Sequence, residues 1–202
     1  AIVDHDTGIS VFEGGAILLY LAEKAGMLIP GDDAGRFEVI QWLFWQAAGL
    51  GPMAGQLSHF RNYAPEPVPY AQQRYANEYD RLLAVMEVRL RDREYLAGKY
   101  SVADIASFPW VVPYKRLGND LGRFPNLRRW FDTLKERPAV RRGVDLGKGW
   151  QRTREPDEKA RAMIEEELGI EIDEQRPSAQ GGEAGCEMDR RRGLAATTLL
   201  LH

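Results

Sequence analysis

The start of the chain constrains its fold most strongly, because a short hairpin leads directly into an apolar helix. Residues 2–3 and 9–11 are rich in apolar side chains and flank the turn-forming segment 4–8, which predicts two short strands. After Glu13, residues 14–21 predict a helix that is apolar on nearly all sides, and such a helix is normally buried between other layers. A hairpin alone is only marginally stable in water. We therefore expect this segment to be the end of a domain.

The rest of the chain, to about residue 164, has the pattern of helices. Gly26 ends the first helix, and residues 27–35 form a linker, since glycine caps helices and Pro30 cannot continue one. A helix over residues 35–48 should bury one stripe of apolar side chains. That stripe consists of Phe37, Ile40, Leu43, Phe44 and Ala47. The Gly- and Pro-containing segment 49–52 should then break or kink this helix.

Two later helices have clear local signals. Apolar residues recur at helical spacing from Tyr75 to Leu90, which predicts a long amphipathic helix. Ser101 and Asp104 have the spacing of a capping box, so a helix should start there and end or bend near Pro109. The capping chemistry makes this pair structural, because losing such a cap costs about 1 kcal/mol.

Composition limits the classes of partner. The net charge of −3 lacks the strongly basic balance typical of a nucleic-acid-binding chain. A single cysteine, Cys186, excludes an internal disulfide, a Cys-x-x-Cys pair and a thiolate metal cluster. No apolar run reaches the roughly 20 residues that cross a bilayer. We expect a cytoplasmic protein with no metal, membrane or nucleic-acid partner.

Several consecutive motifs resemble bacterial glutathione transferases of the Nu class. The similarity extends in order over roughly residues 1 to 164. It rests on residues 9–24, QWLFWQ at 41–46, GLGPM at 49–53, PYA at 69–71 and YSVAD at 100–104. The resemblance implies a mainly α fold, in which a partial thioredoxin-like α/β segment, a two-stranded hairpin plus a helix, is followed by an all-helical transferase domain.

The resemblance also implies a division of the chain. Residues 1–26 would be a remnant of the thioredoxin-like domain, 27–35 the linker, and 36–164 the helical domain with its extension. The family's first strand, first helix and second strand, with the cis-proline after them, would precede Ala1. Residues 165–202 share no period and are expected to be a disordered tail.

The strongest candidate site residue is Glu13, followed by Gly14. In the family an acidic residue here binds the ammonium of the γ-glutamyl end of glutathione, and the next residue, usually serine, binds its carboxylate. Gly14 keeps the backbone N–H but lacks the hydroxyl, which removes a hydrogen bond worth about 1.5–3 kcal/mol. Alternatively, Glu13 merely complements the dipole of the helix that it precedes.

Two further residues are weaker candidates. Arg74 matches an arginine that approaches the thiol or disulfide end of glutathione in the family; alternatively, it forms an exposed ion pair with Glu78 at i+4. Gln46 is a polar candidate for the same cleft. The aromatic residues between Trp42 and Trp45 favour a core or subunit interface.

The resemblance implies glutathione as the bound ligand, a small electrophile or disulfide as second substrate, and a homodimer. Glutathione transfer or disulfide-bond reduction would be the ancestral activity. We assign no catalytic residue, because the family's thiol-activating turn would precede Ala1, and we expect activity to be impaired. The alternative is a non-catalytic helical module for binding or dimerisation.

Overall fold

A computed structural model describes residues 1–148. Residues 1–142 form one compact unit and 143–202 belong to a second. The predicted tail over 165–202, and the part of the predicted helical domain after 148, lie outside the described residues. The division into domains at 27–35 stays a prediction. No helix within the described part of the chain is long and apolar enough to cross a membrane.

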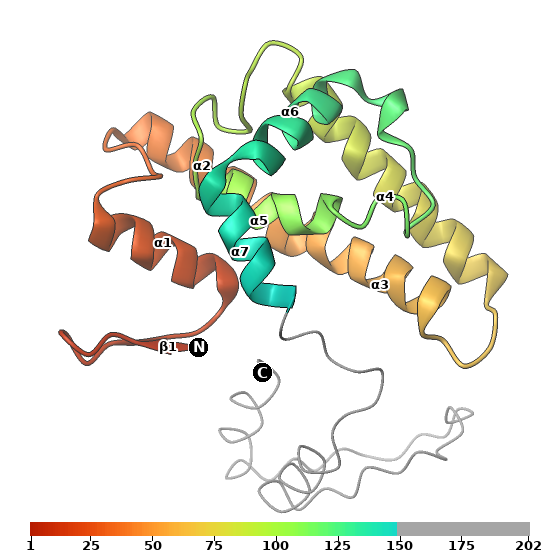
Figure 1. Ribbon diagram of the computed structural model, residues 1–202, viewed down its shortest axis with the longest axis horizontal. Coiled ribbons are helices and arrows are strands. Elements are labelled where there is room, and N and C mark those ends of the chain that lie inside the picture. Colours follow the sequence, from red (N-terminus) through yellow and green to blue (C-terminus); the bar gives the residue numbers. More distant parts are fainter. Residues whose placement is uncertain (149–202) are drawn as a thin grey trace, which may run out of the picture. The chain divides into compact units, whose positions relative to one another are not determined.

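The described elements are one hairpin followed by helices (Figure 1). In chain order they are β1 (Ile2–Val3), β2 (Ser10–Val11), α1 (Gly14–Ala25), α2 (Asp33–Trp45), the π-helix η1 (Gln46–Leu50), α3 (Gly51–Asn62), α4 (Pro69–Arg89), α5 (Val102–Val111), the 3₁₀-helix η2 (Leu121–Arg123), α6 (Pro125–Glu136) and α7 (Pro138–Lys148). The mainly helical fold class with a small antiparallel hairpin is confirmed.

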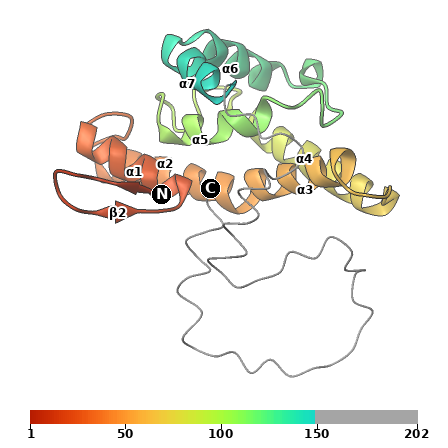
Figure 2. The same cartoon turned by 60° about the horizontal axis from the view of Figure 1, so that its bottom comes forward.

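The predicted hairpin is present, with β1 antiparallel to β2 and Ile2 opposite Val11. It lies beside α1 (Figure 2). A polar network joins the two. Tyr20 of α1 donates a hydrogen bond to Asp4, and Lys24 Nζ lies 2.6 Å from the Asp4 carboxylate and 2.9 Å from that of Asp6. The hydrogen bonds from Lys24 and Tyr20 hold the pKa of Asp4 well below its usual range.

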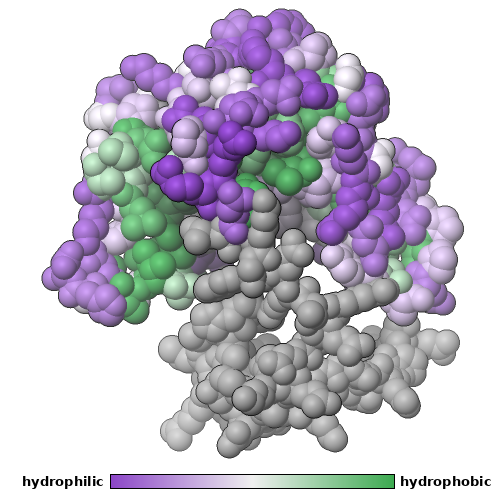
Figure 3. Space-filling view, viewed as in Figure 1, coloured by the Kyte–Doolittle hydropathy of each residue, from purple (hydrophilic) through white to green (hydrophobic). Residues whose placement is uncertain are grey.

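Helix α1 is much less buried than its composition predicts. Of its residues, Ala22 alone is buried, and Leu21 is 46% exposed. Its apolar side chains form part of a hydrophobic area on one face of the molecule (Figure 3). Such a helix is normally enclosed between layers, whereas the described residues cover α1 only in part. The reason is that α1 packs against α5 and the hairpin, while other sides of it face solvent.

Helix α2 begins at Asp33, inside the predicted linker, because the Asp32 side chain accepts a hydrogen bond from the Gly35 N–H at 2.8 Å. Of the predicted stripe, Leu43 alone is fully buried. Phe37 and Phe44 are 58% and 67% exposed. The side chains that are buried on this helix and its continuation are Val39, Leu43, Gln46 and Leu50. Apolar residues occupy several sides of the helix, so their spacing alone does not select the face that is buried.

The segment around Pro52 does not break this helix. Residues 46–50 form a π-helix, in which the Gly51 N–H donates to the Gln46 carbonyl, and α3 follows directly. Pro52 lacks an N–H and would crowd a carbonyl of the preceding turn in a regular α-helix. The wider π register accommodates it, so the predicted disturbance takes the form of a π-helix within a continuous helical run.

The core lies among α3, α4, α5 and α6. Figure 2 shows α5 between α6 and the pair α3 and α4. The predicted long helix is confirmed as α4, and its Tyr79 is fully buried together with Trp130 of α6. Helix α5 carries Pro109 near its end and stops at Val111, as predicted.

The predicted capping box at the start of α5 is present. Asp104 is fully buried, and its carboxylate accepts hydrogen bonds from the Ser101 N–H at 3.0 Å, the Leu96 N–H at 3.0 Å and Trp130 Nε1 at 2.8 Å. Burial raises the pKa of Asp104, and these hydrogen bonds oppose that shift. One carboxylate thus connects the cap of α5, the loop before it and α6.

Candidate functional site

The start of α1 is the most unusual backbone segment among the candidate residues. Glu13 precedes the helix with φ of 69°, which is uncommon for a residue other than glycine. Its side chain is exposed and makes no capping hydrogen bond. Such strained residues cluster at functional sites, where the surrounding structure maintains them. The geometry presents the Glu13 carboxylate to solvent beside the first turn of the helix.

That first turn has unused hydrogen-bond donors. The backbone N–H groups of Gly14, Gly15 and Ala16 have no acceptor within the described residues. The N-terminus of a helix carries a partial positive charge, and free N–H groups there suit an anion such as a carboxylate. Next to them, Glu13 offers a negative charge to an ammonium. A ligand with both charges at one end therefore matches this turn.

The candidate Gln46 follows the last turn of α2, and that turn contacts the start of α1. A Cβ on Gly15 would stand 3.6 Å from the Leu43 side chain, so the start of α1 packs against the last turn of α2. Gln46 follows Leu43 by three residues and is 8% exposed. Its amide is held near Gly51, where a Cβ would stand 2.9 Å from Nε2. Glu13 and Gly14 thus stand at the start of a helix that contacts α2 at Leu43, and Gln46 begins the π-helix that continues α2, with its amide beside Gly51.

Arg74 lies elsewhere, in a groove of about 600 Å³ formed mainly by the first half of α4 and by Met53 of α3. The alternative ion pair with Glu78 does not form. Instead, Arg81 binds both oxygens of the Glu78 carboxylate, at 2.8 and 2.7 Å, and lowers the pKa of Glu78. Arg74 is exposed and has no ion pair within the described residues. No recorded hydrogen bond joins it to Glu13 or Gln46.

Sequence reasoning missed other residues of this groove. Tyr70, in the first turn of α4, is 78% exposed, and Gln73 and Asn77 on the polar face of that helix are bonded to each other at 2.7 Å. The sequence signal that could have identified this groove is Tyr70, a large aromatic residue on the solvent-exposed side of a helix. In residues 1–148 there is no cluster of His, Cys, Asp and Glu side chains that could hold a metal ion. Cys186 lies outside the described residues.

Comparisons with known proteins place these features in a family. The sequence model of the family described as glutathione S-transferase, C-terminal domain, matches residues 57–138 of this chain. The disulfide-bond oxidoreductase YfcG of Escherichia coli is 48% identical over 146 residues, which cover 69% of this chain and 68% of that protein. The disulfide-bond oxidoreductase YghU of the same organism is 40% identical over 147 residues, covering 69% of this chain and 51% of YghU.

Solved structures agree. A glutathione transferase of Burkholderia graminis, with two glutathione molecules bound per subunit, aligns with a TM-score of 0.64 and 45% identity over 68% of this chain and 60% of its own. A glutathione transferase from Pseudomonas putida, with glutathione disulfide bound, aligns with a TM-score of 0.64 and 39% identity. The alignment covers 68% of this chain and 63% of the Pseudomonas putida chain. The chain belongs to the glutathione S-transferase family. It spans between about half and about two thirds of the length of these relatives.

Proposed function

We propose that this chain binds glutathione, with the γ-glutamyl end at the start of α1. One observation carries the proposal: Glu13, in its left-handed conformation, stands beside the free N–H groups of Gly14 and Gly15. The γ-glutamyl end has an ammonium and a carboxylate on the same carbon. Glu13 would take the ammonium, and the helix N-terminus would take the carboxylate. Relatives solved with glutathione or glutathione disulfide support the choice of ligand.

Gln46 and Arg74 would contribute less. Gln46 begins the π-helix directly after α2, the helix that the start of α1 contacts, so its amide is a candidate partner for the peptide part of the ligand. Arg74 keeps a charged group without an ion-pair partner in an open groove, which suits a guanidinium that meets the thiol or disulfide end. Because Gly14 has no side-chain hydroxyl, the γ-glutamyl carboxylate would lack one hydrogen-bond donor. The affinity of this chain for glutathione should therefore be weak.

For the whole protein we propose the reduction of disulfide bonds by glutathione, which the names of the two Escherichia coli relatives suggest. The attacking species in such exchange is a thiolate, so the reaction needs a group that stabilises the glutathione sulfur as an anion. No residue of 1–148 is assigned that role here. The 202 residues by themselves should bind glutathione and turn over slowly. A cytoplasmic location, where glutathione keeps thiols reduced, fits this chemistry.

We also propose a homodimer that uses the outer face of α2. Phe37 and Phe44 on that face are more than half exposed, and Leu21 of α1 is exposed as well. Exposed apolar residues of this size mark interaction surfaces when they gather in one area. This face also supports the second candidate function, a non-catalytic dimerisation module. Light scattering should give a dimer mass for the chain and a monomer mass after Phe37→Ser and Phe44→Ser together.

Calorimetric titration with glutathione tests the binding proposal. Glu13→Gln should weaken binding at least tenfold, because the neutral amide loses the charge-assisted contact with the ammonium. Glu94→Gln, an exposed glutamate between α4 and α5, is the matched control and should leave the affinity unchanged. Equal affinities for Glu13→Gln and the unchanged chain would refute the assignment. If the unchanged chain binds no glutathione at all but dimerises, the module reading is favoured.

A further inference from the structure

A second polar cluster lies at the end of α3, near the first turns of α4, and in the turn after α5. It consists of Arg61, Lys115 and Arg116, with the hydroxyls of Ser58 and Tyr63. We call it the Arg61 cluster. None of its three cations forms an ion pair within the described residues, whereas several other arginines of the chain do. Unpaired cations gathered in one place raise the local affinity for an anion.

A glycine keeps Arg61 in place. Gly118 has φ of 73°, and a Cβ at this position would overlap the Arg61 guanidinium. The Gly118 N–H also closes the turn by donating to the Lys115 carbonyl at 2.9 Å. The guanidinium of Arg61 therefore lies directly against Gly118, two residues beyond Arg116, whereas the Lys115 ammonium lies 5.9 Å from the centre of the Tyr114 ring. Arg61 itself makes no recorded hydrogen bond within the described residues, so its N–H groups are available to a ligand.

Arg116 reaches in the opposite direction, across to α3. Its Nη2 lies 3.4 Å from Ser58 Oγ and 3.4 Å from the Tyr63 hydroxyl, and its guanidinium stands 5.9 Å from the centre of the Tyr63 ring. These contacts orient the side chain but are long and involve no negative charge. Ser58 and Tyr63 lie on either side of Arg61 in the sequence. The Arg61 guanidinium thus contacts the turn that carries Arg116, and the Arg116 guanidinium contacts the segment that carries Arg61.

The neighbouring carboxylate does not neutralise the cluster. Asp80 of α4 accepts hydrogen bonds from Asn119 Nδ2 at 3.1 Å and from Arg123 at 2.9 and 3.2 Å. Asn119 directly follows Gly118, so Asp80 lies beside this turn, as does Asp120, whose carboxylate accepts a hydrogen bond from the Gly122 N–H at 2.9 Å. Asp80 forms its ion pair with Arg123, and within the described residues neither acid forms one with Arg61, Lys115 or Arg116.

We propose that the Arg61 cluster binds the phosphate group of a small phosphorylated ligand. A phosphate carries close to two negative charges and accepts the paired N–H groups of a guanidinium in a bidentate manner. The hydroxyls of Ser58 and Tyr63 add donors at the side. A nucleic acid is disfavoured, since the chain has a net charge of −3 and the cluster is small. The cluster uses none of the residues proposed to bind glutathione, so the two proposals can be tested separately.

The test is an NMR titration of the full chain with inorganic phosphate and with phenyl phosphate, with sodium chloride used to hold ionic strength constant. Saturable binding of both, with shifts at Arg61 and Gly118, is expected. Arg61→Gln and Arg116→Gln should each weaken it about tenfold, the effect of one lost charge-assisted hydrogen bond. Arg61→Lys should weaken it severalfold, because an ammonium lacks the planar fork. Glu13→Gln should leave it unchanged.

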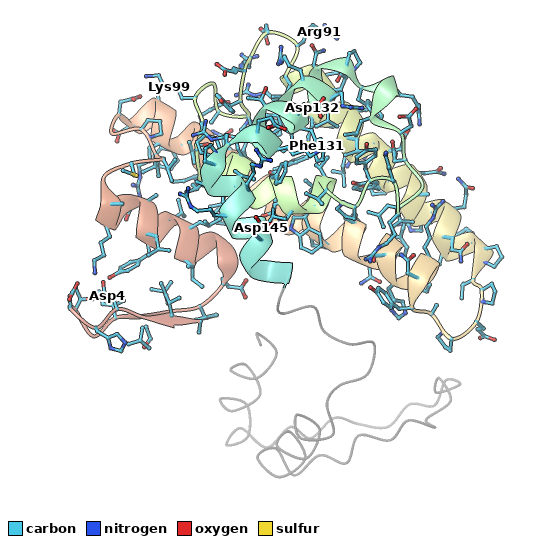
Figure 4. The ribbon with its side chains drawn as sticks, in the orientation of Figure 1. Asp4, Arg91, Lys99, Phe131, Asp132 and Asp145 are labelled. Carbon is cyan, nitrogen blue, oxygen red and sulfur yellow. The ribbon has the colours of Figure 1, made fainter. Side chains whose placement is uncertain are left out.

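Arg91→Gln is the matched control. Arg91 is also exposed and without an ion pair in the described part of the chain, but it follows the C-terminal end of α4 (Figure 4). The Arg61 cluster lies toward the other end of that helix, since Gln72 Nε2 donates to the Phe60 carbonyl at 2.8 Å. Shifts that grow linearly without saturation, a wild-type affinity in Arg61→Gln, or full rescue by Arg61→Lys would each overturn the proposal.

Discussion

The helical core and the region of α1 with its hairpin are stabilised in different ways. Tyr79 and Trp130 in the core are fully buried, and even the acidic side chain of Asp104 is enclosed there, with hydrogen bonds to both of its oxygens. In α1, by contrast, Ala22 alone is buried, and the hairpin is joined to the helix by polar contacts of Asp4. Burial makes the core a rigid support, whereas exposure leaves the backbone donors of α1 open to a ligand.

The contrast extends to the apolar side chains. Many apolar residues of the core helices are buried, with exceptions such as Val88 at 59% exposed, whereas Val3, Phe12 and Leu21 in the region of the hairpin and α1 are all about half exposed. Exposed apolar area of this kind stabilises a protein only when something covers it. We therefore expect the core to carry most of the free energy of unfolding and the α1 region to respond most to partners and ligands.

The largest effect should follow from a change in the core. Asp104→Ala removes the acceptor of the Leu96 and Ser101 N–H groups and of Trp130 Nε1, leaving buried donors without partners. The free energy of unfolding should fall by about 3 kcal/mol or more. Denaturant unfolding measures it. Asp132→Ala, at an exposed position on α6 (Figure 4), should change stability by less than about 0.5 kcal/mol. Equal effects of the two would break the comparison.

A gain should be possible at α1. Gly14→Ser restores the hydroxyl that the family uses, and nothing lies within 4 Å of a Cβ at this position, so the side chain fits. Glutathione affinity should rise about tenfold, the value of one hydrogen bond to a carboxylate. Gly14→Ala, which adds the Cβ without the hydroxyl, separates this contact from the effect on helix propensity. Calorimetry that finds no difference between serine and alanine would show that the hydroxyl is not needed.

The core was more predictable from sequence than the candidate site. The long helix α4 and the capping box at Ser101 follow local rules of spacing and hydrogen bonding, and both were predicted correctly. The buried face of α2 was predicted correctly at Leu43 but not at Phe37 and Phe44, because apolar residues on several sides of the helix compete for the buried position that Val39 takes. At the site, the positive φ of Glu13 and the preference of Glu78 for Arg81 over Arg74 depend on three-dimensional arrangement that spacing does not encode.

A smaller, local effect should follow from pH. Because the pKa of Asp4 is depressed in the folded chain, Asp4 stabilises the folded hairpin fully above the ordinary pKa of 3.8. This stabilisation is lost as the pH falls below that value. The pKa of Lys24 is raised, chiefly by its hydrogen bond to Asp4. Lys24 therefore stabilises the folded hairpin fully below pH 10.5, and this stabilisation is lost as the pH rises above that value. Amide exchange in β1 and β2, corrected for intrinsic rates, should therefore be slowest between these values. Asp4→Asn should flatten the acid side of the profile, and an unchanged profile would contradict the role of this network.

The central claim is that the start of α1 holds the γ-glutamyl end of glutathione. Amide NMR spectra of the chain during a glutathione titration test it most directly, because the ligand carboxylate would meet the N–H groups of Gly14, Gly15 and Ala16 themselves. We predict saturable shifts of these amides, which disappear in Glu13→Gln while the amides of the core around Trp130 stay in place. Saturable shifts confined to other residues, with the amides of Gly14 to Ala16 unmoved, would contradict the account.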